Sequence, residues 1–101
     1  MSVIEIARVA LASGATHEQF IEQNRVLEAG YIVKQPGFLS RELASGEGGG
    51  YVVVVHWRTA ADADASMSRF ATDPNTQGFM SVIDAATMSM DRYQTVALDG
   101  G

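Results

Sequence analysis

The chain has 101 residues, of which 47% are hydrophobic and 19% are charged, and its formal net charge is −5. This composition is typical of one folded domain over residues 1–101 and excludes a disordered chain. Binding to nucleic acid or to an anionic membrane surface needs clustered Lys and Arg, which this acidic chain lacks. It also has no cysteine, which excludes disulfides and zinc–thiolate sites and favours a cytoplasmic location.

The N-terminal third predicts a strand followed by a helix. Apolar alternation over residues 3–11 indicates the strand. Thr16, with Gln19 three residues later, predicts a capping box, and the helix is expected to run to about Val33. Its buried stripe is expected to contain Phe20, Asn24, Leu27 and Tyr31.

A β-hairpin is predicted next. In its first strand Phe38, Ser40 and Glu42 alternate with Leu39, Arg41 and Leu43. A glycine-rich turn at residues 45–50 leads into a second strand that is wholly apolar from Val52 to Val55. Such a strand is expected to be buried on both faces, with helices on one face and a second subunit on the other.

The C-terminal part predicts two helices and a last strand. Thr59 is expected to cap a helix that turns Ala63, Met67 and Phe70 inward. Pro74 ends this helix, and Asn75 is predicted to cap a further short helix that points Phe79, Met80 and Ile83 inward. The last strand is predicted over residues 87–98, with Met88, Met90 and Arg92 on one face. Arg92 is a candidate ion-pair partner for Glu5.

The predicted element order is therefore βαββαβ. This order is that of the ferredoxin-like α+β fold, a four-stranded antiparallel sheet with both helices on one face. The other face would be a bare apolar surface in a monomer, so we expect a homodimer in which two sheets pack together.

Several segments resemble the antibiotic biosynthesis monooxygenase-like family of dimeric α+β barrels. The resemblance covers nearly the whole chain. It is carried by Pro36-Gly37-Phe38, by residues 40–43, by the valine-rich strand ending in Trp57-Arg58-Thr59, by Asp73-Pro74, and by the strand around Met88 and Met90.

This resemblance implies one of several activities. Haem-degrading relatives use an Asn on strand one, a Trp within helix two and a His about ten residues later. Here strand one has no Asn, the helix position falls near Ser66 or Met67, and no His follows His56. Quinone-forming relatives act without metal or flavin on a phenolic substrate that is deprotonated between the sheet and the helices. Trp57 matches the strand-end Trp of that branch, and Val53 stands where some of its enzymes carry Asn. The resemblance therefore implies no cofactor.

Six residues are candidates for the site. Trp57 either walls a pocket for an aromatic ligand or is a core or interface aromatic. His56 points to the opposite face, so it is either a general base or a contact at the sheet edge or dimer interface. Asn24 either meets a ligand or bonds the backbone. Tyr31, Phe20 and Phe79 are expected to line the same cavity or to fill the core. The resemblance favours Trp57 inside.

Two functions remain open from the sequence. The first is a cofactor-independent monooxygenase-like enzyme acting on a small aromatic quinol or phenol, or on a carbonyl compound. The second is a non-catalytic dimer of the same fold that binds a small ligand or is structural. No metal site is expected, because the carboxylates Asp62, Asp64 and Asp73 are too widely spread to converge.

Overall fold

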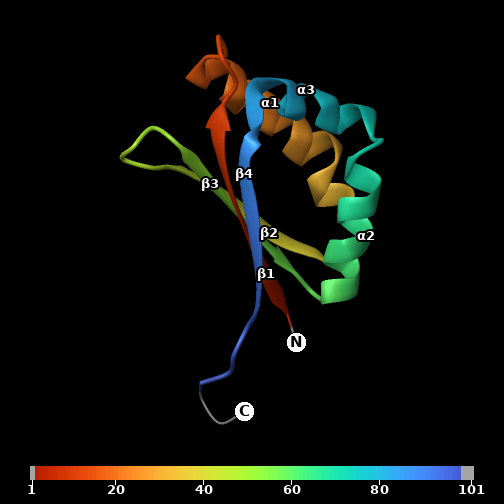
Figure 1. Cartoon of the computed structure of the whole chain (residues 1–101). Helices are drawn as coiled ribbons and strands as arrows, with labels where there is room; N and C mark the ends of the chain where they lie inside the picture. Colours follow the sequence, from red (N-terminus) through yellow and green to blue (C-terminus); the bar gives the residue numbers. More distant parts are fainter. Residues whose placement is uncertain (1, 99–101) are drawn as a thin grey trace.

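The computed structural model describes residues 2–98 and contains one sheet with its helices on one side (Figure 1). The elements are β1 (Val3–Leu11), α1 (His17–Gly30), the 3₁₀ turn η1 (Ile32–Lys34), β2 (Phe38–Ser45), β3 (Tyr51–Trp57), α2 (Ala60–Phe70), α3 (Pro74–Val82) and β4 (Ile83–Gln94). The strand order is β2-β3-β1-β4, and each neighbouring pair is antiparallel. The predicted ferredoxin-like α+β fold is confirmed.

The predicted helix caps at Thr16 and Thr59 are present. Thr16 accepts from the backbone N–H of Gln19, whose side chain accepts from the Thr16 N–H at 2.9 Å. Thr59 accepts from the backbone N–H of Asp62 at 3.1 Å. The predicted cap of the third helix is wrong, because Asp73 takes that role and its carboxylate accepts from the N–H of Asn75. Proline at the first helical position has no N–H to satisfy, so Pro74 begins α3.

Two other boundaries and one set of buried residues differ from the sequence prediction. The first helix ends at Gly30, and a 3₁₀ turn continues the chain to Lys34. The last strand lies over residues 83–94 and not 87–98. The strand begins four residues earlier than predicted, and its first residues lie at an irregularity in the β1–β4 ladder. There the Thr87 hydroxyl donates to the carbonyl of Asp84 and accepts from the N–H of Ala10. In α2 the buried residues are Ala63 and Ser66, whereas Met67 is exposed.

A second irregularity lies where β2 begins. The pairing shifts between Phe38 and Ser40, so that Phe38 pairs with Trp57 while Arg41 pairs with Val55. The extra residue places Phe38 on the same face as Arg41, against the simple alternation expected from the sequence. The rings of Phe38 and Trp57 meet edge to face with centroids 6.0 Å apart. Phe38 therefore buttresses the strand-end tryptophan, and Leu39 is left exposed.

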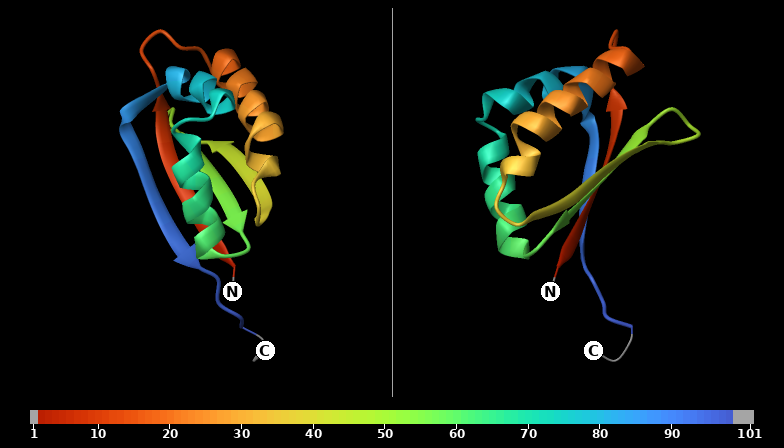
Figure 2. Two further views of the ribbon diagram at one scale, coloured as in Figure 1. Left: turned by 90° about the vertical axis from the view of Figure 1, so that its right-hand side faces the viewer. Right: turned by 180° about the vertical axis from the view of Figure 1, so that it is seen from behind.

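The aromatic core lies where α1 and α3 cover the sheet. Phe20 stands at its centre, 4.2 Å from Tyr51 and 5.9 Å from Phe79 between ring centroids. Phe70 meets Phe79 on one side and Tyr31 on the other. This chain of rings fills one end of the space between sheet and helices, and α2 covers the other end (Figure 2).

The opposite face of the sheet is uncovered by the rest of the described chain (Figures 1 and 2). Ile6 pairs with Val54 and Ile4 with His56 across the middle of this face. These apolar side chains, and Val52, are only half-buried. On the helix side the residues of β3 are buried, as expected. On the other side, where a second subunit was expected to cover the strand, they are only half-buried in the single chain. Among residues 2–98 no helix is long and apolar enough to cross a membrane.

Candidate functional site

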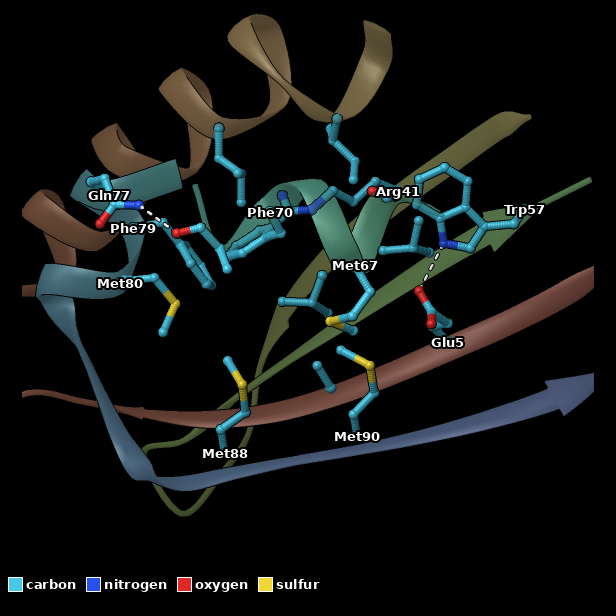
Figure 3. Close-up of a pocket in the computed structure, with 17 residues that line it drawn as sticks. Glu5, Arg41, Trp57, Met67, Phe70, Gln77, Phe79, Met80, Met88 and Met90 are labelled. Carbon is cyan, nitrogen blue, oxygen red and sulfur yellow. Dashed lines mark hydrogen bonds between the residues drawn. The ribbon is translucent and has the colours of Figure 1, made fainter. Parts of the chain in front are cut away.

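A cavity of about 470 Å³ lies between the sheet, α2 and α3 (Figure 3). Its walls are mostly apolar and include Ala7, Leu27, Ile32, Val53, Val55, Phe70, Ala71, Phe79 and the methionines Met67, Met80, Met88 and Met90. Met67 on α2 and Met90 on β4 are 45% and 42% exposed, so the cavity opens to solvent between these two elements. Unbranched methionine side chains make this opening adaptable in shape.

Small side chains on α2 leave the space beneath it unfilled. Ser66 on α2 and Ala71 at its C-terminal cap line the cavity from this side and reach only a short way into it. The helix is held above the gap by polar contacts. The Tyr31 hydroxyl donates to the carbonyl of Ser66, and Arg69 Nε donates to Gln35 Oε1 at 2.9 Å. The cavity is therefore a consequence of small residues on a helix that is tethered at several points.

Glu5 and Trp57 form a buried polar contact in one wall of the cavity (Figure 3). The indole Nε1 donates to Glu5 Oε1 at 2.8 Å, and Glu5 is only 6% exposed. Arg92 on β4 donates to Glu5 Oε2 at 2.9 Å and to Asp64 Oδ1 on α2 at 2.7 Å. The expected Glu5–Arg92 pair is confirmed. These hydrogen bonds, the ones accepted by Glu5 first and the one accepted by Asp64 second, raise the pKa of the Arg92 guanidinium.

A second polar group, Arg41, enters the cavity from β2. Its Nη2 donates to Asn24 Oδ1 at 2.7 Å, and its Nη1 donates to Glu28 Oε1 at 3.0 Å. The amide of Asn24 in turn donates to the carbonyl of Phe20 at 2.7 Å, so its orientation is fixed by α1. Burial lowers the pKa of Arg41, although the hydrogen bond and charge of Glu28 act in the opposite direction.

The structure resolves which of two adjacent residues faces the cavity. Trp57 lines it and is 1% exposed. His56 follows the opposite orientation of the strand and pairs with Ile4 on the uncovered face of the sheet. The sequence offered His56 as a possible general base. Because neighbouring residues of a strand point to opposite faces and Trp57 points into the cavity, His56 cannot act as the base there.

Of the other four candidates, one lines the cavity and three lie behind its lining. Phe79 lines the cavity, whereas Phe20 is fully buried in the aromatic core beside it. Asn24 and Tyr31 do not line it either. Asn24 orients Arg41, and Tyr31 anchors α2 through the carbonyl of Ser66. Both polar side chains thus hold the elements that form the cavity.

Sequence reasoning did not select Arg41, Ser66 or the methionines as site residues, and considered Glu5 only as an ion-pair partner. For Arg41 a signal existed, because the alternation of β2 places it on one face with Leu43. As for metals, no three His, Cys, Asp or Glu side chains converge anywhere in the described part of the chain.

Comparison with solved structures identifies the fold. The chain has the fold of the antibiotic biosynthesis monooxygenase-like proteins. SnoaB, a cofactor-independent oxygenase from Streptomyces nogalater, is 14% identical over 99% of this chain and 98% of its own, with a TM-score of 0.75. A protein provisionally named antibiotic biosynthesis monooxygenase from Chloroflexus aurantiacus is 19% identical over 99% and 98% of the two chains, with a TM-score of 0.67.

A third similar structure has the same provisional name. It comes from Nitrosomonas europaea and is 14% identical over 94% of this chain and 90% of its own, with a TM-score of 0.69. No family model and no curated protein matches the sequence. At these identities the likeness concerns the fold, and function must be argued from the cavity.

Proposed function

We propose that the protein is a cofactor-independent monooxygenase-like enzyme that takes a small aromatic quinol or phenol into the cavity beneath α2. The observation that carries this proposal is the cavity itself, a mostly apolar chamber whose polar lining residues are Glu5, Arg41, Trp57, Ser66 and Gln77. Its volume of about 470 Å³ is within the range of about 300–1,000 Å³ for small-molecule sites.

The proposed reaction requires only oxygen. A phenol gives up its proton, and the electron-rich phenolate reacts with O₂ at a ring carbon that carries hydrogen. The C–H and O–O bonds break, one oxygen atom stays on that carbon as a carbonyl, and the other leaves as water with the phenolic and ring hydrogens. The ring is oxidised to the quinone by four electrons, which O₂ takes up. In this scheme Trp57 supports the aromatic ring, and Glu5 is the one carboxylate in the cavity wall that can accept the phenolic proton. Arg92 offsets the charge of Glu5 and keeps its side chain in place.

Oxygen uptake with a panel of naphthols and dihydroxynaphthalenes tests the proposal. We expect uptake without added cofactor, with one quinone formed for each O₂ consumed. Glu5→Gln should abolish uptake while keeping an acceptor for the Trp57 N–H. His56→Gln is the matched control and should leave the rate unchanged, because His56 lies on the other face of the sheet. Equal rates of oxygen uptake in the Glu5→Gln variant and the unaltered protein would show that Glu5 is not the base of the proposed reaction.

A non-catalytic ligand-binding protein is the second candidate. It is favoured by one observation: both oxygens of Glu5 already accept hydrogen bonds from Trp57 and Arg92. Tight binding of the same compounds with no uptake above the buffer rate would support this second function.

We also propose a cytoplasmic homodimer formed through the uncovered sheet face. Its support is an apolar centre, where the pair of Ile6 and Val54 lies beside Ile4 and Val52. The exposed ion pair of Arg8 and Asp91 lies at the side of this centre. An apolar centre with a polar rim is the usual anatomy of a protein interface.

A further inference from the structure

Arg41 is a buried cation with unused hydrogen-bond donors. Its side chain is 3% exposed. Two of its five N–H groups are donated to Asn24 and Glu28, which leaves three without a protein partner within residues 2–98. A guanidinium removed from water gains most from partners that satisfy all its donors. Because Arg41 lines the cavity, these remaining donors are available to a molecule bound there.

The charge of Arg41 is only partly compensated inside the cavity. Glu28, its ion-pair partner, is 43% exposed, so water screens the negative charge of this carboxylate. Glu5, the carboxylate in the cavity wall, already bonds Arg92 through two N–H groups. Neither acid therefore neutralises Arg41 completely, and the interior retains a positive potential beside this residue.

The positive group enters a lining that is apolar around it. In Figure 3, Arg41 reaches in beside Phe70, with Trp57 toward one end and Phe79, Met80 and Met88 toward the other. A molecule that satisfies both the cation and the apolar lining has one acidic oxygen and a flat apolar body. The oxygen would accept from Arg41, and the body would lie between the indole ring and the methionines.

We propose that the ligand of this cavity is an aromatic anion, a carboxylate or phenolate, and that Arg41 is the residue that binds its charged oxygen. This inference rests on the proposed function and deepens it, since a phenol held as its phenolate is the form that reacts with O₂, whereas a carboxylate would be bound without reacting. It is tested by binding alone, so it can fail or hold separately from turnover.

Two ligands of nearly equal shape, one anionic and one neutral, separate the effect of the ligand's charge from the effect of its aromatic ring. 2-Naphthoate and 2-naphthamide differ in whether the group on the ring is an anion. Each is titrated at neutral pH against the neutral fluorescent probe N-phenyl-1-naphthylamine, whose displacement reports occupancy of the apolar cavity. We expect 2-naphthoate to bind about tenfold more tightly than 2-naphthamide, because hydrogen bonds to an ionised acceptor are the stronger ones.

Variants of the ion pair assign the preference to Arg41. Arg41→Gln should remove the preference for the anion and leave 2-naphthamide affinity within about twofold, because a neutral ligand forms no charge-assisted bond. Arg25→Gln is the matched control: it removes the same charge from an exposed position on α1 and should keep the preference. Glu28→Gln should tighten 2-naphthoate binding by about two- to threefold and leave 2-naphthamide unchanged, since a partly exposed acid contributes modestly.

Three results would overturn the inference. The first is that the unaltered protein binds 2-naphthoate and 2-naphthamide equally well. The second is that Arg41→Gln loses the same affinity for both ligands. The third is that Arg41→Gln keeps the preference for 2-naphthoate. If Arg41→Gln does not fold, as judged by circular dichroism, the Glu28→Gln titration decides, because a purely structural Arg41 would give no gain specific to the anion. Oxygen uptake with phenols but without anion preference would keep the proposed function and refute this inference alone.

Discussion

Replacing Trp57 with phenylalanine should destabilise the fold mainly by removing one buried hydrogen bond. The indole Nε1 donates to Glu5 Oε1 at 2.8 Å, and both residues are buried. A hydrogen bond to a charged group contributes about 1.5–3 kcal/mol. The smaller ring also gives up roughly 1 kcal/mol of apolar burial. Because Trp57 borders an existing cavity, little is added for a new void, and we expect a total loss of about 3 kcal/mol.

Urea unfolding followed by far-ultraviolet circular dichroism measures this loss. Fluorescence is unsuitable, because Trp57 is the one tryptophan of the chain. For a domain of this size the midpoint should fall by about 2 M urea. The same substitution in a Glu5→Gln background should cost less, and the difference gives the coupling between the two side chains, expected to be about 1 kcal/mol or more. A loss below about 0.5 kcal/mol in the first background would refute the reasoning, since that is the effect of an exposed site.

Three further variants test separate features. Arg92→Gln removes the guanidinium that gives two N–H donors to the buried carboxylate of Glu5. Urea unfolding should show a loss of about 2 kcal/mol, less than for a fully buried pair because Arg92 is partly exposed. No loss would show that water already solvates the pair. Gly37→Ala should cost about 1–3 kcal/mol in thermal unfolding, because Gly37 has a φ of +81° and an added Cβ would overlap an α2 carboxylate; Gly48→Ala, with open space around it, is the control, and equal effects would contradict this account. Val54→Lys should convert the expected dimer to a monomer in sedimentation equilibrium at micromolar concentration; a monomeric unaltered protein would refute the dimer.

Most of the fold was predictable because its determinants are local. Alternation in the strands, the capping threonines and the helical stripe from Phe20 to Tyr31 each depend on neighbours within a few residues. The errors arose where a local rule had a competitor. The bulge that turns Phe38 inward depends on pairing with β3. Asp73 capped α3 in place of Asn75, because proline is well suited to the position after a cap.

The site was less predictable than the fold. The sequence left open which of Trp57 and His56 faces inward, and the resemblance only favoured Trp57. In the structure Trp57 lines the cavity, and the alternation of β3 places His56 on the other face. Asn24 was predicted to be buried, but its partner is Arg41, seventeen residues away on another element. Such contacts depend on the distance between α1 and β2, which no local pattern specifies. The hollow beneath α2 depends in the same way on what the side chains leave empty.

The attachment of α2 through polar contacts more than through buried side chains has a consequence for local opening of the chain. Only Ala63 and Ser66 of this helix are buried, and Phe70 at its end is its one ring in the aromatic core. The backbone amides of α2 should therefore exchange with solvent deuterium sooner than those of β1 and β3. A molecule that fills the cavity stabilises the closed form, by about 2.7 kcal/mol at a concentration one hundred times its dissociation constant. Slower exchange confined to α2 would thus reveal an occupied cavity before any reaction of the ligand is known.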